Sequence, residues 1–359
     1  MKIIAFETSC DDTSIALFED EKLICMETAS QIKIHNITGG VVPEVAAREH
    51  ANAIFGVLDT VLEKSGVKLE EIDYIGVTTN PGLLPSLLTG TTVSSTISTI
   101  LKIPIIPINH IQAHIFANFL EREEKEIQFP VVCLTVSGGH NDIYSMKDIW
   151  DLEKVGSTTD DASGEAFDKV AKMMGLGYPG GPIVSQLADE YAVENNKNID
   201  EIISDNSERK TLFPRVWLTK KEADFSFSGL KSAVKREVDK RRGCIVGNGI
   251  KPVPTKDLTL EDQKEISYEF QEAVIEVLAY KLIQVAQQKG VKTVLLAGGV
   301  SANNRLKAEI TKLAQKNNLN FLHPVNNLYC MDNAAMVGIL TYYRVKYGEF
   351  ERKIGVVKV

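Results

Sequence analysis

The first half of the chain alternates short apolar runs with one long amphipathic segment. Residues 3–6, 14–18 and 23–28 are apolar runs separated by polar turns, which predicts a three-stranded meander. From Glu44 to Lys64 the apolar residues follow helical spacing, and Gly66 ends the predicted helix. The other elements predicted here are strands at 74–78 and 105–108 and a helix over 86–101, whose many small side chains favour an interface.

The second half opens with the same order of elements. Residues 131–155 again predict a strand, a polar turn and two further strands, although the repeat is weak in sequence identity. We therefore expect two similar α/β lobes that face a shared cleft, one over residues 1–128 and one over residues 129–359, with insertions at about 194–262. The later elements are predicted as helices at 163–174, 181–191, 228–242, 260–289, from 303 and at 332–343, and strands at 293–297 and 321–322.

The composition is that of a soluble globular protein, with 44% hydrophobic and 25% charged residues over 359 positions. The net charge of −8 excludes a global basic surface, so any contact with nucleic acid needs a local patch. Five scattered cysteines without a C-x-x-C pair argue against a zinc ribbon and fit a reducing cytoplasm. No apolar run is long enough to cross a membrane, and the strand at the start predicts no signal peptide.

Two of the six histidines, His110 and His114, stand four residues apart directly after the strand at 105–108. This spacing puts both imidazoles on one face of a helix, close enough to share a metal ion at the carboxyl end of a strand. A partly buried pair held by hydrogen bonds fits the same spacing, so both interpretations stay open. Asp332 is either a helix N-cap or a carboxylate that joins the two imidazoles.

Three polar turns contain the residue types that commonly bind nucleotides. They lie at Glu7–Thr13, Val136–His140 and Leu296–Asn304, where hydroxyls, glycines and exposed backbone N–H groups favour phosphate or a base. None of the three is a Walker loop or a Rossmann fingerprint. In the helix predicted after residue 163, Glu165 and Asp168 either bind ribose hydroxyls or form an ordinary solvated face.

Taken together, these motifs resemble those of the tRNA N6-adenosine threonylcarbamoyltransferases, in the bacterial TsaD (formerly Gcp) branch. The resemblance spans almost the whole chain in family order. The matching stretches are residues 6–11, 39–50, 109–114, 136–140, 164–169, 178–182, 224–231, 297–303 and 332–333.

The resemblance implies a duplicated actin-like/Hsp70-like ATPase (ASKHA, ribonuclease H-like) fold with two α/β lobes. It implies an acyltransferase that moves the threonylcarbamoyl group of threonylcarbamoyl-AMP to N6 of the adenosine just 3′ of the anticodon. The tRNAs concerned read codons that begin with A, and AMP is released. The implied partners are tRNA, threonylcarbamoyl-AMP or an ATP/ADP-like nucleotide, and the small proteins TsaB and TsaE, with no membrane.

The resemblance also assigns site residues. It implies that His110, His114 and Asp332 hold one divalent metal, usually iron and otherwise zinc. Many bacterial relatives have Glu-Gly where this chain has Gln112 and Ala113, and Thr where it has Met331. They also have Asp at Ser185, so that contact is not carried over. The implied adenylate-binding positions are Thr135, Val136, Ser137, Gly138, Gly139, Asp168, Gly181 and Asn303.

The exocyclic amine of adenine is a poor nucleophile, so the acyl donor must be activated. We expect the metal to polarise the carbamoyl carbonyl or hold the phosphate, and the backbone of residues 137–139 to stabilise the leaving phosphate. Asp11 or Glu7 is expected to accept the amine proton. We also expect helices starting near residues 110 and 332 to meet across the cleft between the lobes. The densest basic stretch is either a tRNA contact or a solvated helix face, and it comprises Lys231, Lys235, Arg236, Lys240, Arg241 and Arg242.

Three other functions compete with this one. A small-molecule kinase of the same fold would not need the His110, His114 and Asp332 set. A metalloprotease would need the adjacent glutamate of H-E-x-x-H, which the histidine pair lacks. A non-catalytic scaffold would not need an intact metal set.

Overall fold

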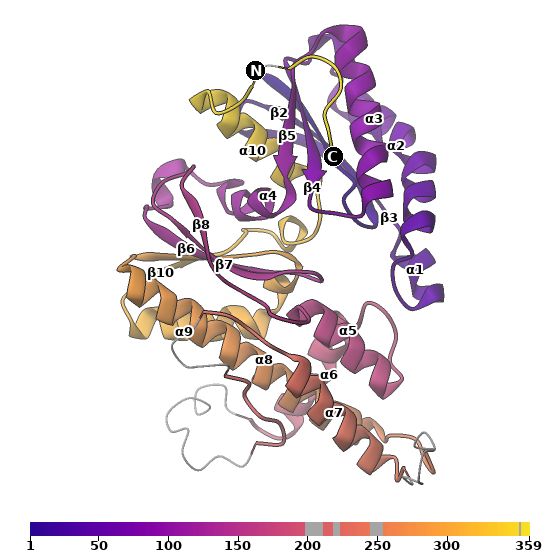
Figure 1. The fold of residues 1–359 in the computed structure, drawn as a ribbon, viewed down its shortest axis with the longest axis vertical. Helices are drawn as coiled ribbons and strands as arrows, with labels where there is room; N and C mark the ends of the chain where they lie inside the picture. Colours follow the sequence, from indigo (N-terminus) through magenta and orange to yellow (C-terminus); the bar gives the residue numbers. More distant parts are fainter. Residues whose placement is uncertain (198–210, 218–222, 245–253, 352) are drawn as a thin grey trace. The chain divides into compact units, whose positions relative to one another are not determined.

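The structure is a computed structural model of the chain, and it describes residues 1–197, 211–217, 223–244, 254–351 and 353–359 (Figure 1). Part of the predicted insertion at about 194–262 therefore lies outside the described residues, at 198–210, 218–222 and 245–253. The contacts divide the chain into two compact units. The first comprises residues 1–128, 295–302 and 322–359, and the second comprises residues 129–294 and 303–321.

The first unit is built on a five-stranded sheet in the order β3-β2-β1-β4-β5. The predicted meander is confirmed, since β1 (Lys2–Glu7), β2 (Asp12–Glu19) and β3 (Lys22–Ser30) pair antiparallel. β4 (Tyr74–Asn80) and β5 (Ile105–Asn109) extend the sheet in parallel from β1. The carboxyl ends of β1, β4 and β5 thus lie at one edge of the sheet, where open α/β sheets place their sites.

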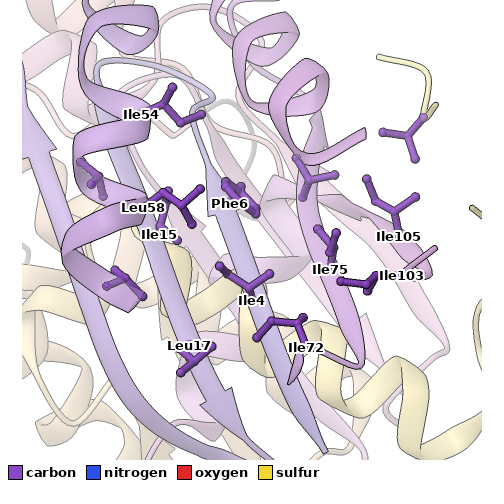
Figure 2. Packing of buried hydrophobic residues seen from close by; sticks show 14 residues of the cluster. Ile4, Phe6, Ile15, Leu17, Ile54, Leu58, Ile72, Ile75, Ile103 and Ile105 are labelled. Atoms are coloured by element: carbon purple, nitrogen blue, oxygen red, sulfur yellow. The ribbon is translucent and has the colours of Figure 1, made fainter. Parts of the chain in front are cut away.

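One face of this sheet carries the apolar cluster shown in Figure 2. Ile4 pairs with Leu17 and Phe6 with Ile15, and because side chains alternate along a strand all four point to the same face. α2 (Pro43–Ser65) covers this face, with Leu58 in the cluster. Each of these buried side chains contributes about 1.5–3 kcal/mol. α3 (Leu84–Leu101) lies beside α2 on the same face (Figure 1).

The opposite face of the first sheet is covered by α10 (Ala334–Tyr347), which contacts β1, β2 and β4. The approach is close enough to require glycine. A Cβ at Gly338 would lie 2.3 Å from a ring carbon of Phe18, and one at Gly76 would lie 2.1 Å from Oγ1 of Thr341. Residues 322–359, expected in the second lobe, therefore belong to the first unit, because α10 buries its apolar residues on this sheet.

The small residues of α3 are used within the unit. A Cβ at Gly90 would lie 2.4 Å from Oγ1 of Thr8, and the hydroxyl of Ser98 accepts a hydrogen bond from the backbone N–H of Gly355 at 2.9 Å. The sequence pattern did not predict α1 (Ile32–Thr38), which follows β3 directly. No helix in the described part of the chain has the length and apolar character needed to span a membrane.

The second unit is built on a sheet in the order β10-β9-β6-β7-β8, the same order as in the first sheet read from the other end. The predicted duplication is therefore confirmed. Its strands are β6 (Val131–Val136), β7 (Asn141–Met146), β8 (Leu152–Ser157), β9 (Thr293–Ala297) and β10 (Asn320–Leu322). Its helices are α5 (Ser163–Met174), α6 (Gly180–Glu194), α7 (Ser228–Arg241), α8 (Leu260–Lys289) and α9 (Asn304–Lys316).

Candidate metal centre and adenylate site

The two histidines lie on α4 (His110–Phe116), the short helix that follows β5. The side chain of Asn109 accepts the Gln112 N–H at 3.0 Å, so the helix is capped directly before His110. The spacing of four residues brings the centroids of the two imidazole rings to 4.6 Å. Both rings are buried, so the predicted arrangement on one face of a helix is confirmed.

Asp332 turns its carboxylate towards the two imidazoles. The cap of α10 is Asn333, whose side chain accepts the Met336 N–H at 3.0 Å, so the N-cap interpretation of Asp332 is wrong by one residue. Asp332 Oδ1 lies 3.1 Å from Nε2 of His114 and 3.5 Å from Nε2 of His110. One donor atom from each of the three residues lies within 4.8 Å of the others.

All three residues belong to the first unit. The expectation that the helices near residues 110 and 332 meet across a cleft between lobes is therefore wrong, because α4 and α10 contact each other inside one unit. Gln112, one of the departures from many relatives, helps to hold them together. Its Oε1 accepts a hydrogen bond from Nη2 of Arg344 at 2.8 Å, which links α4 to α10.

The donor set fits a divalent transition metal. Two imidazole nitrogens and one carboxylate oxygen suit zinc or iron(II), and three protein ligands leave coordination positions open for a substrate. The Asp332 side chain is 27% exposed, whereas the side chains of His110 and His114 are 9% and 1% exposed. Asp332 is therefore the most accessible of the three residues that would hold the metal.

Glu7, at the end of β1, is enclosed behind His110. The residue is 0% exposed, and its Oε1 accepts the Ser9 N–H at 2.6 Å. Its Oε2 accepts the Thr78 hydroxyl at 2.6 Å and lies 3.1 Å from Nδ1 of His110. The carboxylate is closed off from a substrate, which corrects the expectation that Glu7 accepts the amine proton.

The sequence did not point to Ser9 and Thr78 as members of this cluster. Ser9 Oγ lies 3.1 Å from Nδ1 of His110. Thr78 reaches Glu7 because β1 and β4 pair in parallel, with Phe6 opposite Val77. The register of β1 and β4 brings together two residues that are 71 positions apart in the chain. Thr78 could have been predicted as a member of the cluster only from this register.

The two imidazoles differ in charge because their surroundings differ. Burial by itself lowers the pKa of His110, but the carboxylates of Glu7 and Asp332 outweigh it and raise the pKa to about 9. Burial, followed by the charge on His110, holds the pKa of His114 below its usual value. At neutral pH and without metal, His110 therefore carries a second proton and His114 is neutral.

Asp11 lies in the half-buried turn between β1 and β2, and Asp12 is the first residue of β2. The turn is anchored at the Cys10 carbonyl, which lies 3.0 Å from Nε2 of His50 and accepts the Ser86 hydroxyl at 3.3 Å. Burial raises the pKa of Asp12 to about 6. Asp11 stays a predicted proton acceptor.

In the second unit, the predicted adenylate turn follows β6. Thr135 and Val136 are buried in the strand, and the Thr135 hydroxyl donates to the Asp142 carbonyl at 3.2 Å. Ser137 closes the turn, since its N–H donates to the His140 carbonyl at 2.8 Å and its hydroxyl accepts the His140 N–H at 3.1 Å. Gly138 and Gly139 are exposed at the tip.

The first turn of α5 lies against the Ser137–Gly139 turn. A Cβ at Gly164 would lie 2.7 Å from the Ser137 carbonyl oxygen and 2.9 Å from the Gly138 nitrogen. Backbone N–H groups at a turn tip and at a helix N-terminus favour an anion. The N–H groups of Ser163 and Gly164 already donate to Asn141 Oδ1 and to the Ser137 carbonyl, so the exposed backbone of Gly138 and Gly139 is the part of this turn that can meet a phosphate.

Of the other predicted adenylate residues, Asp168 lies on α5, Gly181 at the start of α6 and Asn303 directly before α9. Asp168 Oδ1 accepts the Gly180 N–H at 2.7 Å, next to Gly181. Asn303 caps α9 and also donates from Nδ2 to Ser185 Oγ at 2.7 Å and to Gln271 Oε1 at 2.8 Å. Ser185, which the resemblance did not carry over, thus contacts a predicted binding residue.

Two further predictions concern charged helix faces. Glu165 is exposed and pairs with Lys169 at 2.6 Å, as on an ordinary solvated face. In the basic stretch of α7, carboxylates neutralise much of the charge. The paired residues are Lys231 with Asp161, Lys235 with Asp239, Lys240 with Glu237, and Arg241 with Glu237, Asp262 and Glu265.

Comparison with known proteins gives the family. Among solved structures, (R)-2-hydroxyglutaryl-CoA dehydratase component A of Acidaminococcus fermentans is 13% identical with a TM-score of 0.49, covering 96% of this chain and 99% of that chain. Two relatives are named tRNA N6-adenosine threonylcarbamoyltransferase. The protein from Persephonella marina is 40% identical over 96% of this chain and 91% of its own length. The protein from Staphylococcus aureus (strain Newman) is 39% identical over 97% of this chain and 93% of its own length. The sequence profile described as "TsaD: tRNA N6-adenosine threonylcarbamoyltransferase" matches residues 22–339. The chain therefore belongs to the TsaD family of tRNA N6-adenosine threonylcarbamoyltransferases, which are transferases with the duplicated actin-like fold.

Proposed function

We propose that this protein transfers the threonylcarbamoyl group of threonylcarbamoyl-AMP to N6 of the adenosine just 3′ of the anticodon in tRNA. The observation that carries the proposal is the convergence of His110, His114 and Asp332 in a chain of this family. TsaB and TsaE are the proposed protein partners, as the family resemblance implies.

The adenylate would bind in the second unit. The exposed backbone at Gly138 and Gly139, positioned by the first turn of α5, would hold the phosphate through preorganised N–H donors. Asp168 and Asn303 carry the polar side chains for the nucleoside. The full set of proposed adenylate positions is Thr135, Val136, Ser137, Gly138, Gly139, Asp168, Gly181 and Asn303.

The first unit would hold one divalent metal through Nε2 of both histidines and a carboxylate oxygen of Asp332. Iron(II) is the proposed ion and zinc the alternative, since both accept this donor set. When bound, the ion supplies a Lewis acid for a carbonyl or phosphate oxygen. In the transfer, the amine nitrogen bonds to the carbamoyl carbon, the carbon–oxygen bond to the phosphate breaks, and AMP leaves with the electron pair. Asp11 would take the amine proton.

The test supplies threonylcarbamoyl-AMP, tRNA, TsaB and TsaE to the protein and analyses the nucleosides of the digested tRNA by mass spectrometry. We expect N6-threonylcarbamoyladenosine from the wild type and none from the His110→Ala/His114→Ala variant. His323→Ala is the matched control, because it removes a histidine of the same unit outside the cluster. No modified nucleoside from the wild type would overturn the proposed activity. Full activity of the double variant would overturn the role of the metal.

A further inference from the structure

The imidazole of His110 has different partners on its two nitrogens. Nδ1 faces Glu7 Oε2 and Ser9 Oγ, each at 3.1 Å, and Nε2 faces Asp332 Oδ1 at 3.5 Å. A neutral imidazole carries one N–H donor and one lone pair, and a carboxylate can only accept. Glu7 therefore keeps the proton of neutral His110 on Nδ1 and leaves the Nε2 lone pair facing His114 and Asp332.

We propose that Glu7 is the positioning residue of the metal centre, which fixes the ring orientation and tautomer of His110 without binding the metal itself. The inference rests on the metal centre of the proposed function and adds a residue outside its ligand set. A carboxylate behind a metal-binding histidine holds the ring and raises its basicity.

Glu7 is itself held on both oxygens, so it can act as a rigid support. The Ser9 N–H binds Oε1 and the Thr78 hydroxyl binds Oε2, both at 2.6 Å. The side chain is fully buried, and a buried carboxylate is stable only when it is hydrogen-bonded or paired. Glu7 and Thr78 lie on neighbouring strands of the first sheet. The parallel pairing of β1 with β4 fixes the distance between these strands and hence the position of the Glu7 carboxylate.

His114 has no comparable support. Its Nδ1 is buried and has no hydrogen-bond partner among the residues that the structure describes. A change at Glu7 should therefore disturb one of the two histidine ligands and leave the other in place. Weakened binding with an altered coordination geometry is the expected signature, rather than complete loss of the metal.

The experiment titrates the metal-stripped full-length protein with Zn²⁺ and with Co²⁺, whose visible absorption reports coordination geometry. For Glu7→Gln we expect a dissociation constant about 10- to 100-fold higher than that of the wild type, with a shifted Co²⁺ spectrum. Thr78→Val removes one support of Glu7 and should weaken binding in the same direction by less. Asp12→Asn is the matched control, because it removes a nearby negative charge that is not among the described partners of His110.

Equal affinities and identical Co²⁺ spectra for the wild type and Glu7→Gln would overturn the proposal. An equal loss in Asp12→Asn would also overturn it, because net charge would then explain the effect. If Glu7→Gln does not fold, as judged by circular dichroism, Thr78→Val decides the matter, because it removes the hydroxyl that binds Glu7 Oε2. Failure of the wild type to bind either ion would remove the metal centre and this inference together, and the nucleoside assay would still decide the transfer activity separately.

Discussion

Gly164→Ala tests whether the first turn of α5 positions the Ser137–Gly139 turn as a phosphate site. The added Cβ would lie 2.7 Å from the Ser137 carbonyl oxygen and 2.9 Å from both the Cα and the nitrogen of Gly138. These are all backbone atoms, so no side-chain rotation can relieve the overlap. The turn and the helix must move apart by roughly half an ångström.

The cost of this movement follows from two opposing effects. Overpacking of this kind costs about 1–3 kcal/mol, whereas alanine in place of glycine in a helix recovers about 0.5–1 kcal/mol. The net loss of unfolding free energy is therefore roughly 0–2.5 kcal/mol. The displaced N–H groups would also fit the phosphate less well, and a loss of about 1.4 kcal/mol of binding free energy would weaken phosphate binding about tenfold.

The assay measures AMP binding by isothermal titration calorimetry, together with unfolding by urea. We expect about tenfold weaker AMP binding in Gly164→Ala and unchanged metal affinity, since the metal ligands lie in the other unit. Gly56→Ala is the control, because its Cβ would meet nothing within 4 Å on the exposed side of α2. It should raise stability by about 0.5–1 kcal/mol and leave AMP binding unchanged. Wild-type AMP affinity in Gly164→Ala would refute the reasoning.

Three further predictions follow from the first unit. Asn333→Ala should lower the unfolding free energy by about 1 kcal/mol and weaken metal binding through the adjacent Asp332, as urea unfolding and Zn²⁺ titration would show. Asn333→Asp keeps the oxygen that caps α10 but loses the Nδ2 hydrogen bond to the Met331 carbonyl, so it should not restore wild-type stability. Gly76→Ala should cost about 1–3 kcal/mol against Thr341, and Gly76→Ala/Thr341→Ala should recover much of it; a double-mutant cycle without recovery would contradict the packing of α10 on β4. Because the pKa of His110 in the metal-free protein is about 9, metal must displace a proton below that pH. Affinity should rise from pH 7 to about 9 and then level off, and calorimetry in two buffers should show about one proton released per metal at pH 7.

Long regular elements were predictable because their signals are local. α8 spans Leu260–Lys289, as predicted from its apolar spacing. Thr259 caps it by accepting the Asp262 N–H, and Gly290 ends it with a φ of 66°. Such signals lie within a few residues of the boundary that they set, so a single sequence contains them.

Other features could not be predicted from the sequence, either because two neighbouring residues fit the same role or because the contact joins residues far apart in the chain. Asp332 and Asn333 are equally good cap residues, so spacing alone could not decide which one caps α10 and which one faces the histidines. The burial of Glu7 depends on the pairing of β1 with β4, which no local pattern shows. α1 has only seven residues and is stabilised by a contact between the side chains of His35 and Gln31, so it lacks a long amphipathic pattern.

The location of α10 in the first unit has a consequence for the synthesis of the protein. Domains generally fold from the N-terminus as they leave the ribosome, at about 5–20 residues per second. Here the first sheet and α4 emerge early, but α10 and Asp332 follow only after the second unit has been translated. The delay is roughly 10–50 s at those rates, during which the face of the sheet around Phe18 stays uncovered in the nascent chain. This unit can therefore acquire its third metal ligand only near the end of translation, and it is a natural client for chaperones until then.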